Sequence, residues 1–132
     1  MEWNLKERGL GYEIYTTSKE FNGDVYVASV EVYRTLKSDK FWFHVSSGKK
    51  RKHLEIFEQK EYKSHGGMKA LFWIKEAMYD FPKYYKNTWN KSQYIVVGWA
   101  DNRRRNIYER LTREGFKFSY YEGRKVLMKK LV

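Results

Sequence analysis

The spacing of hydrophobic and polar residues predicts a β-rich first half of the chain. Apolar residues alternate with polar ones, or form short runs rich in β-branched and aromatic residues, as is typical of strands. Asn22-Gly23-Asp24 and residues 46–48 are expected to form turns, and residues 36–40 to interrupt the pattern. The strands predicted in this way are residues 11–17, 25–33, 41–45 and 52–59. An antiparallel meander is the natural arrangement of such strands.

The period changes to that of a helix at residue 68. Apolar residues recur at spacings of three and four as far as residue 81, whereas Lys69, Glu76 and Asp80 form one narrow polar stripe. A helix this apolar is expected to be largely buried against a sheet. Pro82 follows directly and is expected to end the helix. The apolar positions are Met68, Leu71, Phe72, Ile74, Met78 and Phe81.

The last third of the chain predicts one more strand, a second helix and a hairpin. Residues 94–100 form a continuous apolar strand of the kind that is buried on both faces. A helix capped by Asp101 or Asn102 is expected to follow and to end before Gly115, with Leu111 facing inward. The closing strands are residues 116–121 and 125–131, joined by the Glu122-Gly123 turn.

This order of elements predicts one domain over residues 1–132 with an α/β fold of the α+β kind. Its mixed, mostly antiparallel sheet is expected to carry a buried helix after the fourth strand and a second helix before a C-terminal hairpin. A chain of 132 residues, 42% of them hydrophobic, is long enough to bury a core.

Composition narrows the classes of partner. The chain has 27 Lys and Arg against 16 Asp and Glu, a net charge of +11, which favours polyanions such as nucleic acid or a phosphorylated cofactor. It has no Cys, so disulfides, thiol nucleophiles and thiolate metal sites are excluded. The first ten residues are charged throughout, and the longest apolar stretch is too short to span a membrane. We therefore expect a cytoplasmic protein without a membrane partner.

The strongest local motif is the loop that opens the first predicted helix, Glu61-Tyr62-Lys63-Ser64-His65-Gly66-Gly67-Met68-Lys69. Backbone N–H groups at the start of a helix have no partner within the helix, and the helix dipole favours an anion there. Lys63, His65 and Lys69 add positive or donor groups. The loop therefore predicts a phosphate or diphosphate site, although a plain strand-to-helix turn with the same glycines remains an alternative.

In this loop the chain resembles the GNAT superfamily of N-acetyltransferases. Members carry an Arg/Gln-x-x-Gly-x-Gly/Ala loop after the fourth strand, and this loop binds the diphosphate of acetyl-CoA. Lys63 stands at the Arg position and Gly66 at the first Gly. Met68 stands where the family has a small residue, which departs from the pattern.

A second resemblance lies downstream at the expected distance. The family places Asn at the end of the fifth strand, then a helix carrying a Tyr, then Gly-Phe before the sixth strand. This chain has Asn102, Tyr108 and Gly115-Phe116, with three residues more between Tyr108 and Gly115 than is usual. The two motifs and the order of elements cover roughly residues 50–131. An inward core aromatic is the alternative for Tyr108.

The resemblance implies roles for particular residues. Tyr108 would protonate the departing CoA thiolate. Glu55 or Glu58, with His53 as a third choice, would be the general base on the strand before the loop. Backbone N–H groups near Ile56 would polarise the thioester carbonyl. The implied cofactor-binding residues for acetyl-CoA or another acyl-CoA are Ile56, Phe57, Lys63, Ser64, His65, Gly66, Gly67, Met68, Lys69, Asn102 and Arg105.

The pantetheine arm would lie in a gap between the strand that ends near residue 59 and the strand that starts near residue 94. The two acceptor-site helices that the family inserts after its first strand have no counterpart in the pattern of the first 50 residues. An open acceptor face suits a macromolecular amine, on protein or nucleic acid, better than a small one.

Two basic clusters could contact nucleic acid. Lys49, Lys50, Arg51 and Lys52 are expected at a hairpin tip, and Arg103 and Arg104 open the second helix beside Arg105. Solvated surface is the alternative for both clusters. His44, His53 and His65 lack the spacing of metal ligands, so no metal site is expected.

These features predict an acyl-CoA-dependent N-acyltransferase that acts on a macromolecular amine. A degenerate GNAT-like module that binds nucleic acid or a partner protein is the alternative, favoured by Met68 and the missing acceptor helices. A protein that inhibits a partner enzyme is a third possibility.

Overall fold

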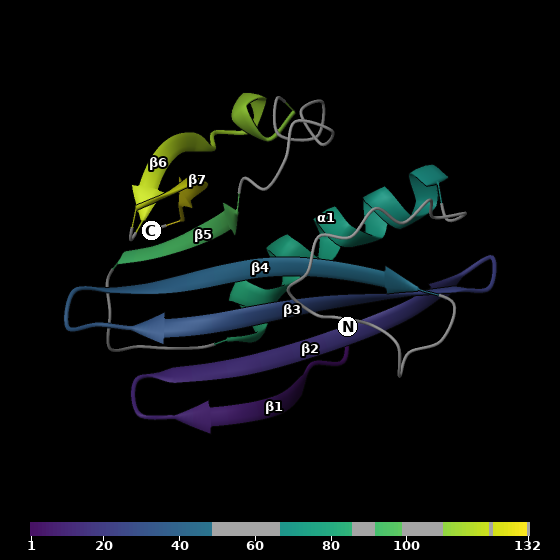
Figure 1. Cartoon of the computed structure of the whole chain (residues 1–132), viewed down its shortest axis with the longest axis horizontal. Coiled ribbons are helices and arrows are strands. Elements are labelled where there is room, and N and C mark those ends of the chain that lie inside the picture. Colours follow the sequence, from purple (N-terminus) through teal and green to yellow (C-terminus); the bar gives the residue numbers. More distant parts are fainter. Residues whose placement is uncertain (49–66, 86–91, 99–109, 122, 132) are drawn as a thin grey trace.

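The architecture is one seven-stranded sheet with a long helix packed on one face (Figure 1). The computed structural model describes residues 1–48, 67–85, 92–98, 110–121 and 123–131. The strand order across the sheet is β1-β2-β3-β4-β5-β7-β6. The elements are β1 (Asn4–Gly9), β2 (Tyr12–Phe21), β3 (Asp24–Arg34), β4 (Ser38–Gly48), α1 (Gly67–Tyr84), β5 (Ser92–Gly98), β6 (Lys117–Tyr121) and β7 (Arg124–Lys130).

All neighbouring strands are antiparallel except β4 and β5, which are parallel. Between these two strands the chain forms α1, so that β4, α1 and β5 make a parallel crossover unit. The predicted fold class is confirmed: the fold is α+β, with a mostly antiparallel sheet, a helix after the fourth strand and helical residues 110–113 before the C-terminal hairpin.

The strands differ from the sequence prediction at three places. Residues 38–40 were expected to interrupt the pattern, but they are the start of β4 and pair with β5. β1 was not predicted, because its exposed charged residues show no apolar alternation. Residues 46–48 are not a turn, as predicted, but the end of β4, where they pair with Val25, Tyr26 and Val27 of β3. Cross-strand pairing with the long β3 therefore overrides the local turn preference of Ser-Ser-Gly. Predicted strand 52–59 lies outside the described residues.

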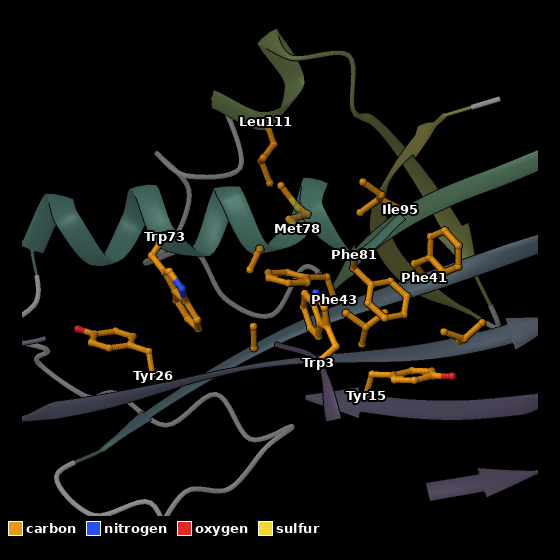
Figure 2. Packing of buried hydrophobic residues seen from close by; sticks show 14 of the residues in the cluster. Trp3, Tyr15, Tyr26, Phe41, Phe43, Trp73, Met78, Phe81, Ile95 and Leu111 are labelled. Carbon is orange, nitrogen blue, oxygen red and sulfur yellow. The ribbon is translucent and has the colours of Figure 1, made fainter. Parts of the chain in front are cut away.

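The core fills the space between α1 and one face of the sheet (Figure 2). From α1 it receives Ala70, Trp73, Ala77, Met78 and Phe81, all at least 92% buried. The prediction of a buried helix is confirmed, but that of Phe72 as one of its inward positions was wrong, because this side chain is 65% exposed. The next residue, Trp73, places its large ring in the core, and Phe72 faces solvent.

The end of α1 also differs from the prediction. Pro82 does not stop the helix but lies within its last turn, and α1 continues to Tyr84. The next backbone N–H, that of Tyr85, still donates to Phe81 O at 2.8 Å. Aromatic packing favours this extra turn, since the Tyr85 ring lies 5.5 Å from that of Phe41.

The predicted end of the second helix is confirmed. Gly115 has φ of +100°, the left-handed conformation expected just beyond a helix. Its N–H donates to Thr112 O at 3.3 Å, and Phe116 N–H donates to Leu111 O at 3.1 Å. Leu111 and Phe116 are both buried in the core, which adds the hydrophobic contact that accompanies this motif.

Candidate functional site

The parallel strands β4 and β5 locate the candidate site. Their carboxyl ends lie at the same edge of the sheet, where ligands of sheets with parallel crossovers commonly bind. Their pairing runs from Ser38 and Ser92 to Phe43 and Val97. Beyond this point β4 continues to Gly48, whereas β5 ends one residue later, at Gly98. The paired stretch therefore ends before β4 does.

The predicted partner of β5 was wrong. We expected the strand at residues 52–59 to face it, but β4 pairs with β5 on one side and β7 pairs with it on the other. Over Tyr94–Val97 both edges of β5 are occupied. The error arises because β1 was not predicted. Without β1, the predicted strand at residues 52–59 was counted as the fourth; with β1, the fourth strand is β4 (Ser38–Gly48).

The first turn of α1 contains the described part of the predicted phosphate loop. Gly67, Met68 and Lys69 are its first three residues, and Lys69 is exposed. This turn has no acidic residue, so no carboxylate of its own occupies the positive end of the helix dipole. These features suit an anion at the amino end of α1.

The other predicted site residues lie outside the described residues and stay predictions. They are Tyr108, Glu55 and Glu58 of the catalytic set; Ile56, Phe57, Lys63, Ser64, His65, Gly66, Asn102 and Arg105 of the cofactor set; and Lys49, Lys50, Arg51, Lys52, Arg103 and Arg104 of the nucleic-acid set.

A buried polar row on the face of the sheet away from α1 was missed by sequence reasoning. Thr16 pairs with Ser29, and Ser29 pairs with His44, so the three side chains form one line across β2, β3 and β4. Thr16 and Ser29 are at least 99% buried. Their hydroxyls have no hydrogen-bond partner among the described residues. The sequence places hydroxyl residues on predicted strands, but only the register brings them together.

The row extends along β4 on the same face. Ser46 is 8% exposed, and within the part of the chain that the structure describes its hydroxyl and the Trp42 indole N–H also lack hydrogen-bond partners. The Trp42 and His44 rings are stacked, with centroids 6.2 Å apart. Buried polar groups without partners are costly, so this polar row is a candidate place for a polar ligand group or ordered water.

Burial lowers the pKa of His44 from 6.5 to about 4. Its imidazole is therefore neutral in the folded protein near neutral pH. His44 lies on β4 one residue beyond the last pair with β5. A pKa this low disfavours uptake of a proton near neutral pH, so the His44 imidazole suits a hydrogen bond as a neutral group and not general-base catalysis.

This pKa gives a pH dependence of stability with a defined sign. Below pH 6.5 the unfolded chain takes up a proton at His44 that the folded protein does not bind. The free energy of unfolding should therefore fall as the pH falls from 6.5 to about 4, and the loss from this one group should be roughly 2 kcal/mol at about pH 5.

Urea unfolding of the wild type and of His44→Phe at about pH 7 and pH 5 measures this effect. Groups other than His44 are shared by the two proteins, so the difference in their pH dependence isolates its contribution. An equal pH dependence in both would contradict the assignment.

A second polar cluster lies at the opposite end of β4 and is structural. The Glu13 carboxylate is buried, forms an ion pair with Arg34 and accepts a hydrogen bond from the Tyr15 hydroxyl. Arg8 Nη2 lies 3.5 Å from Glu13 Oε2, and the Tyr85 hydroxyl donates to Oε1 at 3.5 Å. Because each carboxylate oxygen is already engaged by at least two groups, this cluster holds the sheet and α1 together and leaves no acceptor for a substrate.

Comparisons with known proteins do not assign the chain to a family. No family model, curated protein or solved structure matches the chain. Among the described residues, no helix combines the length and apolar character needed to cross a membrane. The same part of the chain brings together no group of three His, Asp or Glu residues that could hold a metal ion.

Proposed function

We propose that this protein is a small acyl-CoA-dependent N-acyltransferase of the GNAT type that acts on an amine of a macromolecular acceptor. The observation that carries the proposal is that the pairing of β4 with β5 ends at Phe43 and Val97, while β4 continues to Gly48. The GNAT resemblance implies a parting of these strands for the pantetheine arm of acyl-CoA.

Three further features support this function. From the fourth strand onward, a strand, a helix, a fifth strand, helical residues and a closing hairpin follow the order that the resemblance implies. The first turn of α1 presents backbone N–H groups and Lys69 without an acidic residue, which suits the diphosphate. The motif that ends the second helix at Gly115-Phe116 also matches the family pattern.

The roles that the resemblance implies define the proposed reaction. The diphosphate would be held by residues 63–69, and the acceptor amine would attack the thioester carbonyl. Tyr108 would protonate the CoA thiolate as it leaves. The base that takes the amine proton would be Glu55 or Glu58. Acyl-CoA is available in the cytoplasm, and we propose that the protein acts there.

Isothermal titration with acetyl-CoA tests the cofactor. We expect binding with a Kd between about 1 μM and 1 mM, the usual range for substrates. Lys63→Glu should weaken it at least tenfold, because a carboxylate would then face the diphosphate. No binding at millimolar acetyl-CoA would remove the enzyme proposal. Tyr108→Phe should keep acetyl-CoA binding but slow transfer of the acetyl group to an amine acceptor, measured as release of free CoA.

The alternative is a degenerate GNAT-like module that binds nucleic acid without acyl transfer. Met68 favours it, because a large side chain stands where the family has a small residue beside the phosphates. A net charge of +11 favours it too. Salt-dependent binding to nucleic acid without any binding of CoA would select this function.

A further inference from the structure

The C-terminal hairpin β6–β7 exposes two aromatic rings at the edge of the sheet. β6 is the last strand of the sheet, and it pairs on one side with β7. Phe118 is 49% exposed and Tyr120 is 75% exposed. Because they are two residues apart on a strand, both rings lie on the same face of the hairpin. Such exposure is unusual for neighbouring aromatic residues and indicates a binding surface.

The same hairpin is strongly basic. The strands contain five charged residues, all of them positive: Lys117, Arg124, Lys125, Lys129 and Lys130. Lys125 pairs directly with Tyr120 across the hairpin, and its Nζ lies 4.9 Å from the centre of the Phe118 ring. Lys125 therefore lies beside the exposed rings and on the same face, whereas Lys117, Arg124 and Lys130 belong to the other face of the hairpin.

The hairpin is also held firmly to the rest of the protein. Lys129 Nζ donates a hydrogen bond to the Tyr79 hydroxyl of α1 at 3.2 Å and lies 4.8 Å from the centre of that ring. Val126 and Leu127 of β7 are fully buried. Because these contacts hold the hairpin in place, little conformational entropy is lost when a ligand binds to its rings.

Flat rings with adjacent cations match the chemistry of single-stranded nucleic acid. Unpaired bases stack on aromatic side chains, and Lys or Arg side chains pair with the phosphates. A duplex hides the faces of its bases, so it would use the charges but not the rings.

We propose that the β6–β7 hairpin binds single-stranded nucleic acid, with bases stacked on Phe118 and Tyr120 and with Lys125 beside the backbone. The inference rests on the proposed function in one respect: it identifies the macromolecular partner of that function as single-stranded nucleic acid. The site differs from the predicted basic clusters at residues 49–52 and 103–105 and applies equally to an enzyme and to a binding module.

Fluorescence anisotropy with labelled oligo-dT and oligo-rU of about twelve nucleotides tests this site. The wild type should bind both at low salt and should weaken steeply as salt rises. Phe118→Ala and Tyr120→Ala should each weaken binding roughly tenfold. Phe72→Ala, which removes an exposed ring from α1, is the matched control and should bind like the wild type.

Three results would overturn the inference. One is unchanged binding by the Phe118→Ala/Tyr120→Ala double variant. Another is equal competition by a duplex of the same length. The third is a wild-type dimer, seen by light scattering, that the double variant abolishes while neither protein binds oligonucleotide; the exposed edge of β6 would then pair with a second copy.

The same variants separate this site from the proposed enzyme. The double variant should keep the circular dichroism spectrum of the wild type and its affinity for acetyl-CoA, because neither ring is among the residues assigned to acyl-CoA. Loss of acetyl-CoA binding in every protein, with retained oligonucleotide binding, would remove the enzyme but leave the hairpin site.

Discussion

Phe81→Ala is expected to lower the free energy of unfolding by about 4 kcal/mol, because it leaves a cavity at the centre of the core. Phe81 is 1% exposed. Its ring centre lies 4.9 Å from that of Trp3, 5.3 Å from Tyr15, 5.4 Å from Phe41 and 5.7 Å from Tyr85. One ring therefore joins α1 to the N-terminal segment and to β2 and β4, and truncating it removes contacts with all of them at once (Figure 2).

The matched control is Phe72→Ala, on the same helix but 65% exposed. It should change stability by less than about 0.5 kcal/mol. Urea unfolding followed by tryptophan fluorescence measures both variants. A loss below about 1 kcal/mol for Phe81→Ala would show that α1 is not packed on the sheet in this way.

Arg34→Met is expected to cost about 3 kcal/mol, because it removes the closer ion-pair partner of the buried Glu13 carboxylate and leaves only the more distant, exposed Arg8. The guanidinium also lies over the Tyr85 ring, 5.3 Å from its centre. This second contact connects β3 to the residue that follows α1. Met keeps much of the apolar stem, so the loss reports mainly the charge.

Two further variants show whether the buried carboxylate is the cause. Arg8→Met should cost less than about 1 kcal/mol, since Arg8 is 66% exposed and lies 3.5 Å from Glu13. The double variant Glu13→Gln/Arg34→Met should be more stable than Arg34→Met alone, because a neutral amide needs no positive partner. Equal stability of the single and double variants, measured in urea, would contradict the account.

The elements that could be predicted are those whose signal is local. The run at residues 25–33 became β3, and the Gly115-Phe116 pattern gave the end of a helix because a left-handed residue is needed there. β1 could not be predicted, because all but the last of its residues are exposed and its pairing with β2 fixes it. The length of β4 likewise depends on its partner β3 and not on its own Ser-Ser-Gly.

The candidate site likewise has one part that the sequence can predict and another that only the structure reveals. A loop motif can suggest the amino end of α1, because the glycines and lysines adjoin in sequence. The polar row could not be found, because Thr16, Ser29 and His44 meet only through the register of three strands. The cation–aromatic contact between Lys125 and Phe118 depends on the hairpin register in the same manner.

The measurement that tests the central proposal most directly is a titration of ¹⁵N-labelled protein with CoA and, separately, with pantetheine, which lacks the diphosphate. Backbone amides that hold a diphosphate should shift with the first ligand alone. We predict such shifts at Gly66, Gly67, Met68 and Lys69 with CoA, and none at these four positions with pantetheine. Unmoved amides at these positions under saturating CoA would contradict a diphosphate site at the start of α1.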